Sequence, residues 1–271
     1  MIKNSKIVIT GSTSGIGFEM MKMLAEPELG NTILTCSRTA EEKLSDYAEN
    51  VIAFNADTGS QEGIDSIFAK AEELFDKIDI FIANSGFPYY EKFDYVNYDK
   101  IEKIYRVNVF GPIYTYQKYL AHLNGREGKM AITASAMGTM AMPGYTLYTS
   151  TKFALNGFQE ALYLEIPKNI KLTTIYPVAT NTNFFNVGNS VFALKPFPVQ
   201  EPTTVAKAAI KGIDKGKQKV SPCKLFDISK VLTFICPPVK KLYWWEEKLK
   251  FKMFLKESQK ANPRHSEKVY K

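Results

Sequence analysis

The sequence predicts an α/β fold, a doubly wound parallel sheet with helices on both faces, followed by a C-terminal helical extension. Two observations predict this fold. Short apolar runs alternate with longer helical patterns over roughly 175 residues, which is the order of strand and helix in a parallel sheet. The strand-like runs, such as residues 78–84, contain almost no polar alternation. Strands that helices cover on both faces have this composition.

Each expected strand is a short apolar run, and a helical pattern follows it. We expect strands at residues 6–10, 32–37, 51–55, 78–84, 129–134 and 171–176. We expect helices at residues 16–25, 41–48, 61–75, 98–123, 148–165 and 202–215, and two more at 228–235 and 239–256. The apolar segment 181–200 has no regular period. We therefore expect one domain at residues 1–221 and an extension at residues 222–271, in accord with the usual size of a domain.

The charge of the chain is concentrated in the extension. The formal net charge is +7, yet residues 1–221 hold 23 basic and 23 acidic residues. Residues 222–271 hold 12 basic and 5 acidic residues. A composition of 45% hydrophobic and 23% charged residues is ordinary for a globular protein and excludes disordered and fibrous classes. A function that depends on positive charge is therefore expected only of the extension.

The cysteines and the N-terminal residues indicate a reducing compartment. Cys36, Cys223 and Cys236 form no close pair, and the chain has only two histidines, so we expect neither disulfides nor a metal site. Residues 7–9 are too short an apolar run for the core of a signal peptide. No run of about 18 uncharged apolar residues is present, so we expect no spanning helix. The expected location is the cytoplasm.

The first expected strand runs directly into a glycine-rich turn. Glycines at this strand-to-helix turn let the backbone approach a pyrophosphate, and the following helix directs free N–H groups at the anion. The turn lacks the Gly-Lys-Ser/Thr ending of a nucleoside triphosphate loop, which argues against an ATPase or kinase. The residues predicted to bind a dinucleotide here are Gly11, Ser12, Thr13, Ser14, Gly15, Ile16 and Gly17.

Residues after the second and third strands bear on the choice of dinucleotide. An acidic residue after the second strand would hold the ribose 2′-hydroxyl of NAD, but Ser37 and Arg38 stand there. Arg38 could pair with a 2′-phosphate, which favours NADP(H). Arg38 could also be a solvated surface arginine, and position 14 is a neutral serine rather than a second basic residue, so NAD(H) is also possible. Asp57 could bind the adenine amino group or close a turn.

Tyr148 and Lys152 stand four residues apart on an expected helix, so their side chains share one face. A tyrosine exchanges a proton with a carbonyl group when its pKa falls from about 10 toward neutrality, and a nearby ammonium lowers that pKa. Ser135 follows a strand and could hold the substrate oxygen. Asn108 could anchor a water that relays protons to the lysine. A Tyr-x-x-x-Lys motif alone is common by chance. Here it follows the glycine-rich turn, Asn108 and Ser135 in that order, and each stands at a strand end or on an adjoining helix.

Together these motifs resemble the single-domain branch of the short-chain dehydrogenases/reductases, over roughly residues 5–215. The spacing agrees as well, with 27 residues from Asn108 to Ser135 and 13 from Ser135 to Tyr148. The resemblance implies a Rossmann-type sheet, NAD(P)-dependent oxidation and reduction of secondary alcohols and ketones, and a homo-oligomer, either dimer or tetramer. The residues that carry it are 10–17, 57, 84–86, 108, 135, 148–152 and 177–182.

The resemblance also implies roles for these residues. Tyr148 would be the general acid/base, and Lys152 would lower its pKa and bind the nicotinamide ribose. Ser135 would orient the carbonyl oxygen, and Asn108 would support the proton relay. The remaining implied cofactor contacts are Asn84 and Gly86 near the adenosine ribose and Thr182 at the nicotinamide carboxamide.

Apolar side chains follow Ser135 and fill the segment after the sixth strand. Methionines would form an adaptable apolar wall, which indicates a lipophilic ketone or secondary alcohol. Candidates are a 3-keto lipid, such as a keto-sphingoid base or a 3-oxoacyl chain, and a hydroxysteroid. The same side chains could instead pack internally or at a subunit contact. A non-catalytic dinucleotide sensor or scaffold is the alternative function. The expected substrate-pocket residues are Met137, Met142, Tyr145, Phe184 and Phe185.

The extension combines aromatic residues with lysines. Leu242, Trp245, Leu249 and Met253 form one stripe of the last expected helix, and lysines occupy much of the remainder. Such a helix is typical of a segment that lies on an anionic membrane surface, here through residues 222–256. Docking on its own domain or on a second subunit remains open. We expect no nucleic-acid partner, and a location at the inner membrane face if the membrane hypothesis holds.

Overall fold

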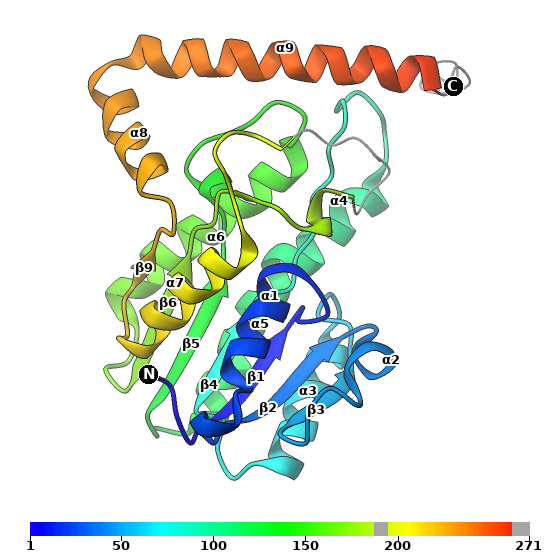
Figure 1. Cartoon of the computed structure of the whole chain (residues 1–271). Coiled ribbons are helices and arrows are strands. Elements are labelled where there is room, and N and C mark those ends of the chain that lie inside the picture. The colour runs from blue at the N-terminus through cyan, green and yellow to red at the C-terminus, as the bar shows by residue number, and fades with distance from the viewer. Residues whose placement is uncertain (187–194, 262–271) are drawn as a thin grey trace.

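The computed structural model describes residues 1–186 and 195–261, and within them it contains a seven-stranded parallel sheet in the order β3-β2-β1-β4-β5-β6-β9 (Figure 1). The order reverses between β1 and β4, and the carboxyl ends of these two strands border a crevice where ligands bind in such sheets. The predicted fold class is confirmed. The strands are β1 Lys6–Thr10, β2 Thr32–Ser37, β3 Val51–Asn55, β4 Ile80–Ala83, β5 Gly128–Thr133, β6 Ile170–Ile175 and β9 Lys219–Val220.

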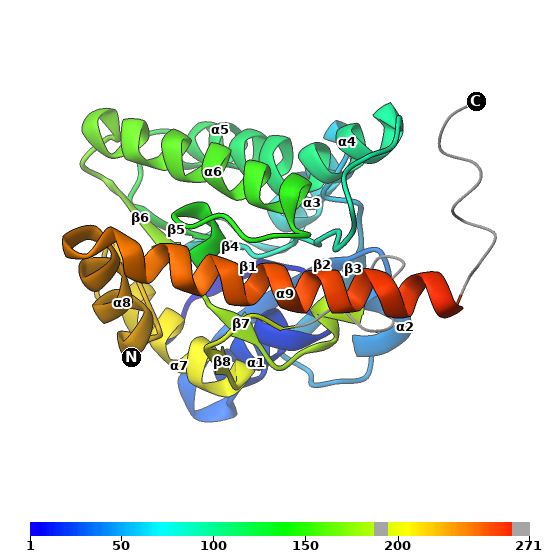
Figure 2. The same ribbon diagram turned by 90° about the horizontal axis from the view of Figure 1, so that it is seen from above.

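Helices cover both faces of the sheet, as the apolar strands require (Figures 1 and 2). Neighbouring residues of β4 show this: Phe81 is buried against α3 and α5, and Ile82 is buried in the core on the side of α1 and α7. A separate pair of short parallel strands, β7 Ala179–Thr180 and β8 Val199–Gln200, lies beyond the sheet. The helices are α1 Gly15–Leu24, α2 Ala40–Leu44, α3 Gln61–Leu74, α4 Tyr98–Tyr105, α5 Gly111–Leu123, α6 Thr146–Glu165 and α7 Pro202–Asp214.

The helix expected at residues 98–123 is not continuous. A π-helical turn, Arg106–Phe110, separates α4 from α5. Pro112 has no N–H group, so it cannot bond to the carbonyl of Asn108 four residues earlier, and the α-helical ladder is interrupted there. Gly111 passes so close to the preceding loop that a Cβ would lie 2.4 Å from the carbonyl oxygen of Thr58. The wide turn places Asn108 at the break.

The extension forms two helices, α8 Lys224–Ile235 and α9 Pro237–Ala261. Pro237 begins α9, where a missing N–H group costs nothing, so the prolines separate the two helices. Seen from the side and from above, α9 crosses over the edge of the sheet at the carboxyl ends of its strands (Figures 1 and 2). In the described parts of the chain, no helix is both long and apolar enough to cross a bilayer.

The inner side of α9 is anchored to the body of the protein. Trp244 Nε1 donates to the carbonyl of Ala141 at 2.9 Å, and the Tyr243 hydroxyl donates to the carbonyl of Phe197 at 2.8 Å. Phe254 is buried, with its ring centroid 4.6 Å from that of Tyr90. Docking of the extension on its own domain, one of the alternatives left open, is therefore observed, while contact with a membrane or a second subunit stays a prediction.

Candidate active site

A cavity of about 940 Å³ opens at the carboxyl edge of the sheet, beneath α9. Its walls come from the loops after β1 and β4, the end of β5, the start of α6 and the segment after β6. Phe226 of α8 and Tyr243 of α9 complete the wall. Cavities of up to about 1,000 Å³ are typical of ligand sites, so this one has room for a cofactor and a substrate.

The glycine-rich turn forms one end of the cavity. Gly11 and Gly15 have φ values of +66° and +62°, which favour glycine. A Cβ at Gly17 would lie 2.3 Å from the carbonyl oxygen of Gly11, so this glycine lets α1 pack directly on the turn. The backbone and the start of α1 thus fit a pyrophosphate. The predicted residues that line the cavity here are Gly11, Thr13, Ser14, Gly15 and Ile16.

Two of the predicted loop residues support the turn from behind. Ser12 is fully buried, and its hydroxyl hydrogen-bonds the hydroxyl of Thr35 on β2. Gly17 lies under the turn, as described above, and does not line the cavity. The sequence pattern identifies the loop correctly, but it does not separate residues that face a ligand from residues that hold the loop in place.

Arg38 and Asp57 line the cavity shortly after the ends of β2 and β3. Arg38 is exposed and forms no salt bridge with any residue that the structure describes. Asp57 Oδ1 accepts a hydrogen bond from the Gly59 N–H at 2.9 Å. Asp57 therefore closes a turn, which was one of its two predicted roles, while its side chain still borders the cavity.

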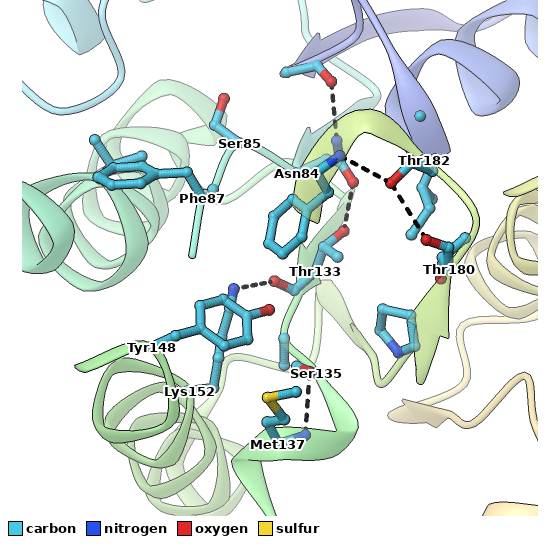
Figure 3. A pocket seen from close by; sticks show the side chains of 18 of the residues that line it. Asn84, Ser85, Phe87, Thr133, Ser135, Met137, Tyr148, Lys152, Thr180 and Thr182 are labelled. Carbon is cyan, nitrogen blue, oxygen red and sulfur yellow. Dashed lines mark hydrogen bonds between the residues drawn. The ribbon is translucent and has the colours of Figure 1, made fainter. Parts of the chain in front are cut away.

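Asn84 fastens the ends of three strands together at the centre of the site (Figure 3). Its Nδ2 donates to the carbonyl of Gly11 at 3.1 Å, and its Oδ1 accepts from the Thr133 hydroxyl at 3.0 Å. Its backbone N–H donates to the hydroxyl of Thr10 at 3.1 Å. Both polar ends of the Asn84 side chain are therefore engaged within the protein, and it positions the glycine-rich turn.

Tyr148 and Lys152 project into the cavity from the first turns of α6, with Ser135 nearby (Figure 3). The Lys152 ammonium lies 5.6 Å from the centroid of the Tyr148 ring and donates to the carbonyl of Thr133 at 3.0 Å. Ser135 Oγ accepts from the Met137 N–H at 3.1 Å, which caps a short 3₁₀ turn, Ala136–Gly138. The predicted Ser-Tyr-Lys group is thus assembled in one place.

Burial is the main cause of the pKa shifts of Tyr148 and Lys152 in the chain without a ligand. Burial lowers the pKa of Lys152 to about 7, because few neighbours compensate the ammonium for lost water. Burial also raises the pKa of Tyr148 above its ordinary value, and hydrogen bonding with Ser135 opposes this. The lowering of the Tyr148 pKa by Lys152 together with a bound, cationic nicotinamide stays a prediction.

Asn108 lies behind the cavity rather than on its wall. Its side chain is fully buried and clamps the loop after β4: Oδ1 accepts from the Phe87 N–H at 3.1 Å, and Nδ2 donates to the Phe87 carbonyl at 3.0 Å. A Cβ at Gly86 would lie 3.2 Å from Asn108 Oδ1 and 3.7 Å from Lys152 Nζ. Both polar atoms of the side chain are thus engaged with the Phe87 backbone, and the predicted role of Asn108 in a proton relay stays a prediction.

The apolar end of the cavity contains some of the predicted substrate residues. Met137, Met142 and Phe184 line it. Thr182, a predicted cofactor contact, also lines the cavity, but beside the glycine-rich turn, where a Cβ at Gly15 would lie 3.2 Å from its Cγ2. Tyr145 does not line it, because the ring packs behind Tyr148 with its centroid 4.6 Å from that of Tyr90. The side chain of Phe185 and residues 187–194 of the apolar segment lie outside the described residues.

Sequence reasoning missed the contribution of the extension to the cavity. Phe226 and Tyr243 both line it, but only the outer stripe of the last helix stood out in the sequence. A second set, Tyr243, Phe251 and Phe254, has helical spacing on another side of α9 and was the available signal. Among the described residues, no group of three or more His, Cys, Asp or Glu side chains is placed so that it could hold a metal ion.

Comparisons with known proteins show what the chain is similar to. The 3-ketodihydrosphingosine reductase of Bos taurus is 26% identical over 219 residues, which cover 76% of this chain and 65% of the relative. The 3-dehydrosphinganine reductase of Danio rerio is 27% identical over 234 residues, which cover 79% of this chain and 70% of the relative. The match to the bovine relative therefore spans less than two thirds of that protein's length.

A solved structure and a family model extend the comparison. The 3-ketoacyl-(acyl-carrier-protein) reductase of Brucella melitensis, complexed with NADH, superposes with a TM-score of 0.72 at 22% identity, over 82% of this chain and 97% of that one. At this identity the likeness shows the fold. The sequence model described as short chain dehydrogenase matches residues 5–191, which is more than half of the chain. The chain therefore belongs to the short-chain dehydrogenase/reductase family.

Proposed function

We propose that the protein is an oxidoreductase that transfers a hydride between NADP(H) and a ketone or secondary alcohol of a hydrophobic substrate. One observation carries the proposal: a single cavity joins the glycine-rich turn at one end to Ser135, Tyr148 and Lys152 at the other. A dinucleotide held by the turn would reach these three side chains within the same cavity. Catalytic and cofactor-binding groups that meet in one cavity are the arrangement such a reaction needs.

The residues of the turn fit a nicotinamide dinucleotide, which supplies the hydride when it is bound. Gly11 and Gly15 have the positive φ angles that favour glycine. The helix α1 begins at the turn and directs its free N–H groups toward it. Arg38, without an ion-pair partner among the described residues, is available for a 2′-phosphate and favours NADP(H) over NAD(H). The solved relative from Brucella melitensis was complexed with NADH, so this preference rests on Arg38 alone.

The side chains of the site supply the proton chemistry. Tyr148, kept protonated by burial, donates its proton to the carbonyl oxygen as the ketone becomes an alcohol. Ser135 Oγ accepts the Met137 N–H, and its hydroxyl, which hydrogen-bonds Tyr148 in the chain alone, would donate to the same oxygen once the ketone is bound. Lys152 has a pKa of about 7 and exchanges protons readily at neutral pH. Its charged form favours the tyrosinate that remains after the transfer.

The apolar end of the cavity favours a long aliphatic substrate. Met137, Met142 and Phe184 line it, together with Phe226 and Tyr243 of the extension. Two of the relatives described above are named as reductases of 3-keto sphingoid bases. We therefore propose a 3-keto lipid, first of all a keto-sphingoid base, as the substrate class; 3-oxoacyl chains and hydroxysteroids are the competing candidates.

A homo-oligomer in the cytoplasm is the proposed assembly and location. Phe110, at the start of α5, and Phe153, on α6, are exposed apolar side chains that a second subunit could cover. Light scattering of the purified protein tests this part: a monomer across the working concentration range would refute it, whereas a dimer or tetramer that Phe153→Ser dissociates would support it.

The test of the reaction follows nicotinamide absorbance with a panel of lipophilic ketones, for the wild type and for Tyr148→Phe. We expect the wild type to oxidise NADPH with at least one long-chain 3-ketone and the variant to be strongly impaired. The alternative is a non-catalytic dinucleotide sensor. It would be favoured if the protein bound NADPH in a fluorescence titration but turned over no ketone and no alcohol.

A further inference from the structure

The last helix presents apolar side chains on two opposite sides. Tyr243 and Phe254 face the body, as described above. Leu242, Trp245 and Leu249 point away from it, with exposed fractions of 66%, 60% and 39%, and Met253 continues this row at 55%. Successive members of the row are three or four residues apart, so they share one side of the helix. This row is the stripe that the sequence analysis singled out, and the body leaves it uncovered.

The exposed row continues at the end of α8. Phe234 and Ile235, directly before the two prolines, have exposed fractions of 86% and 74%. They lie at the corner where α8 meets α9 (Figure 1). We call these two residues and the row on α9 the outer face. Apolar surface of this extent on a soluble protein marks an interaction site.

Lysines accompany the outer face. Lys241, Lys248, Lys252 and Lys256 are exposed, and none of them forms a salt bridge with a residue that the structure describes. By contrast, Lys250 is paired with Glu246 and Glu247. The whole surplus of positive charge in the chain belongs to residues 222–271. The partner of the outer face therefore has to be both apolar and negatively charged.

We propose that the outer face docks on an anionic lipid bilayer. A helix with apolar side chains, an exposed tryptophan and flanking lysines gains both from burial at the acyl boundary and from attraction to acidic headgroups. A second copy of the chain is the competing occupant. A two-fold contact would set the unpaired lysines of one copy against the same lysines of the other, and like charges oppose such an interface.

The two sides of α9 connect the bilayer to the cavity. Tyr243, on the inner side, lines the cavity, while its neighbour Leu242 belongs to the outer face. Phe226 of α8 lines the same cavity. A lipid ketone therefore passes from the bilayer to the site beside these helices without crossing bulk water. This route rests on the proposed function, whereas bilayer docking itself does not.

Co-sedimentation of the full chain with vesicles tests the docking. We expect the protein to pellet with phosphatidylcholine/phosphatidylglycerol vesicles at low salt, and at least about tenfold less with phosphatidylcholine alone or at high salt. The double variant Leu242→Gln/Trp245→Gln should lower binding by about tenfold or more. The matched control Val96→Gln/Leu164→Gln removes two other exposed apolar side chains and should bind as the wild type does.

Two results would overturn the proposal. The first is a wild type that stays in the supernatant with anionic vesicles at low salt, or an outer-face variant that binds as well as the control. The second is a wild-type dimer, seen by light scattering without lipid, that the outer-face variant alone dissociates, since a second copy would then cover the face. Turnover of a water-soluble ketone, measured in parallel, separates a failure of docking from a failure of the proposed reaction.

Discussion

The ammonium of Lys152 lies 5.6 Å from the centroid of the Tyr148 ring, and its hydrogen bond goes to the carbonyl of Thr133. The lysine therefore acts on the tyrosine through its electric field across the ring. An interaction of this kind depends on the charge of Lys152, and burial brings the pKa of that group to about 7. The charge of this lysine, and with it the electric field at the tyrosine, therefore depends on pH near neutrality.

The first prediction concerns the proton donor. Tyr148→Phe removes the hydroxyl but keeps a buried ring, so the fold and the affinity for NADPH should persist. We expect kcat to fall by about 10²–10⁴-fold, the usual size of a general acid effect. Stopped-flow or steady-state absorbance measures the rate, and circular dichroism controls for folding. A variant with more than a tenth of the wild-type rate would remove Tyr148 from the proposed mechanism.

The second prediction links stability to pH. The pKa of Lys152 is about 7 in the folded chain, against 10.5 for the free side chain, so the unfolded chain binds more protons between these pH values. Stability therefore rises with pH across this window, and the destabilisation is complete below about pH 7. Lys152→Met should be inactive yet more stable than the wild type by about 1–3 kcal/mol at pH 6.

Urea unfolding of both proteins from pH 6 to pH 10 measures this difference. We expect the gap between variant and wild type to narrow as pH rises, because the neutral lysine no longer opposes folding. Ser150→Ala, on the same helix, serves as the control and should show no such slope. A gap that stays constant with pH would mean that Lys152 is not the group responsible.

The third prediction concerns the choice of dinucleotide. Arg38→Ala should raise the Kd for NADPH by about ten- to a hundredfold, since a charge-assisted hydrogen bond contributes about 1.5–3 kcal/mol. The Kd for NADH should change by less than about twofold. Fluorescence titration with each dinucleotide gives both constants. Equal losses for NADPH and NADH, or no loss for either, would contradict a 2′-phosphate contact.

The fourth prediction concerns the docking of α9 on the body. Phe254 is buried among aromatic rings, so Phe254→Ala should cost about 3–5 kcal/mol of local stability and release the end of the helix. Met253→Ala, one residue earlier and 55% exposed, is the matched control. Limited proteolysis should cut the first variant within α9 well before the second. Equal cutting rates would indicate that Phe254 does not hold the helix.

Much of the fold was predictable because burial on both faces leaves a clear mark on each strand. Val51–Asn55 and Thr32–Ser37 form exactly where their apolar runs lie. The break near Asn108 was not predicted, because its cause is a single missing N–H group at Pro112 within a strong helical pattern. The two-residue strand β9 is too short to show any periodicity, and only its pairing with β6 defines it.

The residues of the candidate site that belong to local sequence motifs were predictable. The residues that distant segments bring to the site were not. Tyr148, Lys152 and Ser135 converge as their spacing and position at strand ends predict. The contacts of the Asn108 side chain could not be predicted, because its two polar atoms bond to the backbone of Phe87, a residue on a loop distant in sequence. The inner side of α9 was hidden for a physical reason. A helix that packs apolar groups on two sides loses the single contrast by which one buried side is recognised.

The alternation of inner and outer residues on α9 has a consequence for insertions and deletions. Leu242 and Tyr243 are neighbours in the chain, yet one faces outward and the other borders the cavity. One residue added before them would turn the rest of the helix by about 100°, because an α-helix has 3.6 residues per turn. Both surfaces would then be lost together. This helix therefore tolerates exchange of side chains far better than any change in its length.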